Sequence, residues 1–108
     1  MSDYDKAVQV IDFNARRLAR HDADTLPLIK AMEYLNNPMA YVDITDILQQ
    51  WAKGPNTMAI FTWLDKDIYD SLNAFQRDTL IQRWIQYYVN YMERFLKQNI
   101  EKGFSNGL

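Results

Sequence analysis

The chain of 108 residues contains no cysteine, and this absence excludes several kinds of site at once. Disulfides, thiolate metal sites and cysteine nucleophiles all require a residue that the sequence does not have. Small secreted domains often depend on disulfides, so the absence favours a reducing compartment. The acidic first residues also lack the basic start and apolar stretch of a signal peptide. We therefore expect a cytoplasmic protein.

Other residues that catalysis commonly uses are also scarce. His21 is the only histidine, which excludes zinc sites built on histidine and cysteine and makes a Ser-His-Asp triad improbable. Three scattered glycines cannot form a phosphate-binding loop or a dinucleotide fingerprint. Asp65, Asp67 and Asp70 form a cluster, but the glycine and terminal glutamate of a calcium loop are absent. We expect no enzymatic activity, no metal site and no cofactor.

Long apolar runs are missing as well. The uncharged run over residues 54–64 is far shorter than the ~20 residues of a membrane helix, so we expect no membrane partner. Three glycines and three prolines are few for the many turns of a β-sandwich or barrel. The composition, 48% hydrophobic and 24% charged, is that of a globular chain. It suits one domain over residues 1–103 with a flexible tail over 104–108.

Apolar residues recur at helical spacing between capping and stop signals, which predicts an all-α bundle of about five helices. Ser2 with Asp5, and Asn73 with Gln76, are typical of capping boxes at helix starts. The helices are expected over 3–20, from Asp22 or Asp24 to Asn36, over 38–52, over 56–72 and over about 74–102. Short connections favour antiparallel neighbours.

The long last helix carries more apolar surface than a surface helix needs. Its apolar residues cover about twice the ~100° arc that is usual for an amphipathic helix. One explanation makes this helix the central post of the domain, with the shorter helices wrapped around it. The other leaves an aromatic edge that includes Trp84, Tyr87 and Tyr91 outside, as a surface for a partner protein or for a second copy in a homodimer.

Two further aromatic residues fall off the apolar faces of their predicted helices. Phe13 lies among Arg16, Arg17 and Arg20, which suits cation–π contacts or a hydrophobic anchor ringed by positive charge. Trp63 lies on a polar face of the fourth predicted helix. Each is a candidate contact for a partner, and each can instead pack against a neighbouring helix.

Charge is distributed unevenly along the chain. Residues 22–70 hold three basic and eight acidic residues, whereas residues 1–21 hold four basic and three acidic, and residues 71–108 five basic and three acidic. If the first and last helices lie side by side, six basic residues share one surface: Arg16, Arg17, Arg20, Arg83, Arg94 and Lys97. Such a surface suits nucleic acid or an acidic protein, unless its charges form weak pairs with the acidic middle.

Taken together, these patterns favour a non-enzymatic protein-interaction module, such as a small regulator, inhibitor, adaptor or complex subunit. It would bind a larger protein, or itself, through its aromatic helix faces. The alternative is a nucleic-acid-associated protein that uses the basic patch on the first and last helices.

Overall fold

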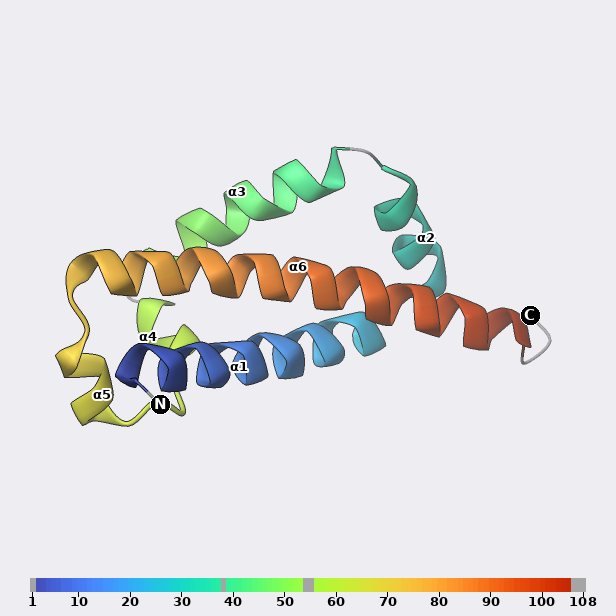
Figure 1. Ribbon diagram of the computed structural model, residues 1–108. Helices are drawn as coiled ribbons and strands as arrows, with labels where there is room; N and C mark the ends of the chain where they lie inside the picture. The colour runs from blue at the N-terminus through green and yellow to red at the C-terminus, as the bar shows by residue number, and fades with distance from the viewer. Residues whose placement is uncertain (1, 38, 54–55, 106–108) are drawn as a thin grey trace.

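The computed structural model describes residues 2–37, 39–53 and 56–105, and within these ranges it contains six helices and no strand. The all-α prediction is confirmed (Figure 1). The helices are α1 (Asp3–Thr25), α2 (Leu28–Asn36), α3 (Ala40–Ala52), α4 (Thr57–Ile60), α5 (Lys66–Ser71) and α6 (Ala74–Ser105). None of them combines the length and apolar content needed to cross a membrane.

The long helix α6 sets the shape of the molecule. Its 32 residues, at 1.5 Å each, give about 48 Å, close to the longest dimension of 51 Å. The other two dimensions are 25 and 20 Å, so the molecule is elongated along this helix. Helices α1, α2, α3 and α4 all pack against α6. This arrangement agrees with the expectation that the last helix is the central post.

Helices α1 and α6 lie side by side and run in the same direction (Figure 1). Tyr91 donates a hydrogen bond to Asp12, and Arg20 donates one of 3.3 Å to Asn99; both pairs are separated by 79 residues. Because the sequence separation is the same at both contacts, the two helices run parallel. The expectation of antiparallel neighbours does not describe this pair, because α2 to α5 return the chain to the end where α1 began.

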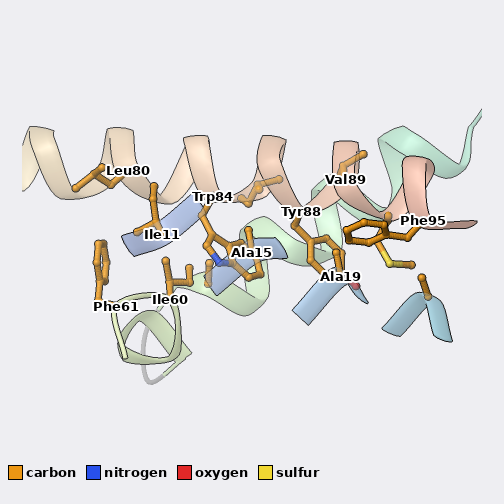
Figure 2. Packing of buried hydrophobic residues seen from close by; sticks show 14 of the residues in the cluster. Ile11, Ala15, Ala19, Ile60, Phe61, Leu80, Trp84, Tyr88, Val89 and Phe95 are labelled. Atoms are coloured by element: carbon orange, nitrogen blue, oxygen red, sulfur yellow. The ribbon is translucent and has the colours of Figure 1, made fainter. Parts of the chain in front are cut away.

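Small residues on α1 allow this close pairing. Every fourth residue of α1 from Ala7 onward is buried, and the helical spacing places these residues in one row. The row is Ala7, Ile11, Ala15, Ala19 and Ala23. Figure 2 shows Ala15 and Ala19 beside the rings of Trp84, Tyr88 and Phe95 of α6. Large side chains on one helix thus fill the space left by alanines on the other.

The predicted caps form at the starts of α1 and α6, and the one at α6 is a complete, reciprocal capping box. Ser2 Oγ accepts a hydrogen bond of 3.1 Å from the backbone nitrogen of Asp5, at the start of α1. At the start of α6, the Asn73 side chain accepts from the Gln76 backbone at 2.8 Å, and the Gln76 side chain accepts from the Asn73 backbone at 3.0 Å. Both patterns satisfy backbone N–H groups that have no partner inside the helix.

Several predicted helix boundaries are wrong. Helix α1 continues to Thr25 instead of ending near Arg20, so Asp22 and Asp24 lie inside it and do not cap α2, which follows Pro27. The predicted helix over 56–72 is two short helices, α4 and α5, separated by a turn in which Leu64 N donates to Phe61 O at 2.9 Å. Asp65 starts α5 by accepting a hydrogen bond of 2.8 Å from the Asp67 backbone.

Parts of three predictions lie outside the described residues. These are the helix start at Pro38, the stop signal at Gly54 and Pro55, and the last three residues of the predicted tail, 106–108. The first two tail residues, 104 and 105, belong to α6. On α3, Ile44, Leu48 and Trp51 are half-buried whereas Ile47 is 61% exposed. Helix α3 therefore covers α6 loosely.

Candidate functional site

Trp84 belongs to the core and not to the surface. Its side chain is 0% exposed, and its ring stacks between Trp51 and Tyr88 at centroid distances of 5.7 and 5.4 Å. The indole Nε1 donates a hydrogen bond of 3.0 Å to Oδ1 of Asn14. The prediction of Trp84 as a partner contact is therefore wrong for this fold: the ring fills the space between α1, α3 and α6 and offers no surface.

Asn14 is a core residue that the sequence analysis missed. It is buried on α1, where its Oδ1 receives the Trp84 indole and its Nδ2 donates a bond of 3.0 Å to the carbonyl oxygen of Ala59. One amide thus connects α1, α4 and α6 and satisfies the buried indole N–H of Trp84. The available signal was its position, since Asn14 lies three residues after Ile11 and falls on the apolar side of the first helix.

Tyr87 and Tyr91 lie at the rim of the core, half-buried and packed against it. The Tyr91 hydroxyl donates to Asp12, and this hydrogen bond raises the pKa of Tyr91. Its ring stacks on Phe95 at 5.8 Å, and the Arg94 guanidinium lies 5.7 Å from its centroid. The aromatic edge of α6 is thus mostly engaged within the domain, and a partner contact through these two tyrosines stays a prediction.

Phe13 and Trp63 form one cluster, although the sequence singled them out separately. Their rings meet edge to face at 5.5 Å, and the Arg17 guanidinium lies 5.8 Å from the Phe13 centroid and 5.2 Å from that of Trp63. Phe13 is 53% exposed and Trp63 is 50% exposed, so the contact buries only part of each ring. We call these three residues the aromatic–arginine cluster.

Beside this cluster the parallel helices α1 and α6 form an open groove of about 560 Å³. Its lining, which we call the basic groove, is Phe13, Arg16, Arg17, Arg20, His21, Arg94, Phe95 and Gln98. Four of the six basic residues expected on one surface therefore meet here. The other two do not line it: Arg83 lies near the Tyr4 ring, and Lys97 pairs with Glu93 at 2.8 Å.

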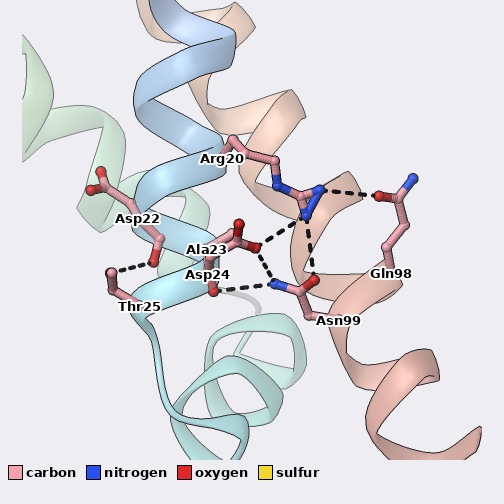
Figure 3. A network of polar contacts seen from close by, with 7 residues as sticks. All are labelled: Arg20, Asp22, Ala23, Asp24, Thr25, Gln98 and Asn99. Atoms are coloured by element: carbon pink, nitrogen blue, oxygen red, sulfur yellow. Dashed lines mark hydrogen bonds and ion pairs between the residues drawn. The ribbon is translucent and has the colours of Figure 1, made fainter.

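Among the described residues, Arg20 is the one arginine of the basic groove that forms hydrogen bonds within the domain. It forms an ion pair with Asp24 at 3.2 Å and donates to Gln98 and Asn99 at 3.4 and 3.3 Å (Figure 3). Its guanidinium also lies 4.0 Å from the centroid of Phe95. Arg20 thus joins the end of α1 to α6.

The remaining arginines of the groove keep their polar groups available. Arg16, Arg17 and Arg94 are exposed, and across residues 2–37, 39–53 and 56–105 none of them forms an ion pair or a side-chain hydrogen bond. Arg17 contacts rings only, and stacking uses the face of the guanidinium while its N–H groups lie in the plane. The guanidinium groups of these three arginines therefore face solvent around one groove.

A second hollow, of about 390 Å³, adjoins the basic groove. It is lined by Arg17, His21 and Trp63 among others, so Arg17 and His21 border both hollows. In the part of the chain that the structure describes, no three carboxylate or histidine side chains gather where they would hold a metal ion. The chain matches no protein-family model, no curated protein and no solved structure.

Proposed function

We propose that the protein is a non-enzymatic protein-interaction module, a small regulator, inhibitor, adaptor or complex subunit that binds a larger protein. The observation that carries the proposal is the aromatic–arginine cluster, in which two rings from distant parts of the chain are held together yet remain half exposed. Tryptophan and arginine are among the residues that contribute most at protein interfaces. The cluster joins both types on one surface.

The cluster is also already ordered before a partner arrives. The edge-to-face contact and the Arg17 guanidinium fix the two rings relative to each other. Ordering a side chain on binding costs about 0.5–1.5 kcal/mol, so rings held in place in the free protein lower the cost of association. This is the arrangement expected of a binding surface that changes little on contact.

The magnitude of the available burial indicates that the rings do not act alone. A Phe and a Trp bury about 150–250 Å² each, so covering the exposed halves removes roughly 150–250 Å² from water. At about 25 cal/mol per Å² this contributes roughly 4–6 kcal/mol. Association costs at least about 4 kcal/mol in lost translational and rotational freedom. Contacts to the neighbouring arginines are therefore required for a stable complex.

Affinity purification from the native host tests this proposal. Proteins retained by the wild type are expected to be lost with the double variant Phe13→Ala/Trp63→Ala and kept by Phe75→Ala. Phe75 is the matched control because it is 79% exposed and lies outside the cluster. The double variant should keep its melting temperature within a few degrees, since both rings are half exposed. Equal loss of binding and stability, or partners unaffected by the double variant, would refute the proposal.

The partner in this proposed function can be a second copy of the chain, and a separate experiment tests this form of it. A second copy can occupy the cluster or the rim formed by Tyr87 and Tyr91. Size-exclusion chromatography with light scattering at high protein concentration should then show a dimer that the Phe13→Ala/Trp63→Ala or Tyr87→Ala/Tyr91→Ala variants lose. A monomer at every concentration removes the homodimer and leaves a different protein as the partner.

Nucleic-acid association is the second candidate function, and the basic groove is the observation that favours it. Phosphate groups bind guanidinium groups well, and Arg16, Arg17 and Arg94 face solvent together. Binding to random duplex DNA should in that case fall steeply as salt rises, because counterions are released. No binding at low salt eliminates this function.

A further inference from the structure

We propose that the segment which enters the basic groove is a short acidic peptide, with carboxylates that pair with Arg16 and Arg94 and an apolar side chain that packs between them. This inference rests on the proposed function and names the chemistry of the partner. It starts from the three exposed arginines that the domain leaves unpaired. A carboxylate accepts two parallel hydrogen bonds from a guanidinium group, so it is the simplest ligand for these arginines.

The lining of the groove is both cationic and aromatic. Phe13 and Phe95 are its aromatic residues, and Arg16, Arg17 and Arg94 surround them. Phe95 is only 5% exposed, whereas Phe13 is 53% exposed, so a ligand that carries charge alone would leave the Phe13 ring uncovered. An apolar ligand alone would bury unpaired cations at a cost. The groove therefore fits an amphipathic segment in which acidic residues flank an apolar one.

Acidic residues confine the positive surface to a short length. Asp12, which accepts a hydrogen bond from Tyr91, lies one helical turn before Arg16 on α1, and Asp24 pairs with Arg20 at the other end of the arginine row. Beyond the groove, residues 22–70 hold eight acidic and three basic residues. A peptide of a few residues stays within the cationic part and is complementary to it.

This confinement argues against a nucleic-acid ligand. A duplex carries a charge about every 1.7 Å along its axis and continues past any short patch. On this protein a duplex that continued along α1 past the arginines would meet Asp12 on one side and Asp24 on the other. The repulsion would offset the contacts in the groove, whereas a short carboxylate segment avoids it. The acidic peptide is therefore the better fit.

Selection from a phage library of random peptides of about twelve residues, on the immobilised full chain, tests the inference. The selected peptides should be enriched in Asp and Glu around an apolar residue. A synthetic copy of the best peptide should bind with a Kd that rises about tenfold or more in Arg16→Glu/Arg94→Glu. Lys66→Glu/Lys97→Glu, with the same change in net charge outside the groove, should bind like the wild type.

A charge swap in the peptide completes the test. Replacing its acidic residues by lysine should abolish binding to the wild type and restore binding to Arg16→Glu/Arg94→Glu, which a merely structural role of the arginines would not produce. The inference is overturned if no peptide is selected, if the selected peptides lack acidic residues, or if both double variants bind equally. Tighter, Arg16- and Arg94-dependent binding of a random duplex would overturn it in favour of nucleic acid.

These outcomes are separable from failure of the proposed function. If host proteins are retained through Phe13 and Trp63 while acidic peptides do not bind, the interaction module stands and only the chemistry of its partner is wrong. If acidic peptides bind through Arg16 and Arg94 while no host protein depends on Phe13 and Trp63, the groove is confirmed and the aromatic–arginine cluster is not its interface.

Discussion

The Tyr88 hydroxyl donates a hydrogen bond of 2.5 Å to Oδ2 of Asp22 and thereby joins α6 to α1. The pair borders a hollow of about 280 Å³ that Ile47, Leu48 and Trp51 of α3 help to line. Burial raises the pKa of Tyr88 far above that of a free tyrosine, and the hydrogen bond to the Asp22 carboxylate raises it further. The protonated phenol therefore belongs to the folded state.

The pKa of Tyr88 predicts a loss of stability at alkaline pH. Below the ordinary tyrosine pKa of 10.0 both states hold the proton and the contribution is complete. Above it the unfolded chain releases the proton that the folded protein keeps, so the free energy of unfolding falls by about 1.4 kcal/mol per pH unit. Tyr88→Phe should flatten this fall. Urea unfolding at pH 9, 10 and 11 measures the free energy of unfolding of both proteins. An equal fall with pH in the wild type and in Tyr88→Phe would contradict the prediction.

Replacement of Asn14 should destabilise the fold strongly. Asn14→Leu leaves the buried Trp84 indole N–H without its partner, whereas the Ala59 carbonyl still accepts from the Thr62 hydroxyl at 2.9 Å. One unsatisfied buried group costs about 1–3 kcal/mol, and chemical denaturation should show a loss of about this size. Asn90→Ala, on the exposed side of α6, is the matched control and should be nearly neutral. Adding Trp84→Phe to Asn14→Leu should cost less than the two single losses combined, and strict additivity would speak against the bond.

Enlargement of an alanine between the parallel helices should separate them. Ala15 is 0% exposed and faces the rings of α6, so Ala15→Leu forces bulk into filled space at a cost of about 1–3 kcal/mol or more. Ala74→Leu adds the same atoms at an exposed position and should change the melting temperature little. Thermal unfolding followed by circular dichroism compares them, and equal melting temperatures would mean that α1 and α6 do not pack as described.

Among the arginines of the basic groove, Arg20 should contribute to the stability of the fold and Arg16 should not. Arg20→Met removes the ion pair with Asp24 and the bonds to Gln98 and Asn99, and should lower the free energy of unfolding by about 1 kcal/mol, since the site is partly exposed. Arg16→Met should be neutral because Arg16 has no such partner among the described residues. Denaturant midpoints of the two variants test this, and a larger effect of Arg16→Met would reverse the assignment.

Local signals in the sequence were sufficient for the starts of α1 and α6 and insufficient for the end of α1 and the start of α2. Ser2 and the Asn73–Gln76 pair cap through neighbours three residues away, so their pattern is readable from the chain alone. Asp22 and Asp24 resemble caps, but they bond to Tyr88, Arg20 and Asn99. These partners are mostly far along the chain, and no local pattern contains them.

The candidate site was predictable residue by residue but not as an assembly. Phe13 and Trp63 each stood out because an aromatic residue lay on a polar helix face, yet their contact depends on how α1 lies relative to the turn after α4. The wide apolar arc of α6 held both core and rim residues, and periodicity does not distinguish them. Asn14 of α1 fixes Trp84 inside, and this contact across 70 residues appears only in the fold.

The parallel pairing of α1 and α6 has a consequence for how the protein folds during its synthesis on the ribosome. The α6 partners of Asn14, Asp22, Asp12 and Arg20 emerge 66 to 79 residues after them. At a synthesis rate of ~5–20 residues per second, roughly 4–15 s pass between synthesis of the alanine row of α1 and synthesis of the α6 residues that cover it. The nascent chain thus carries a helix whose inner face has nothing to cover it, and cooperative folding begins only when the last helix is translated.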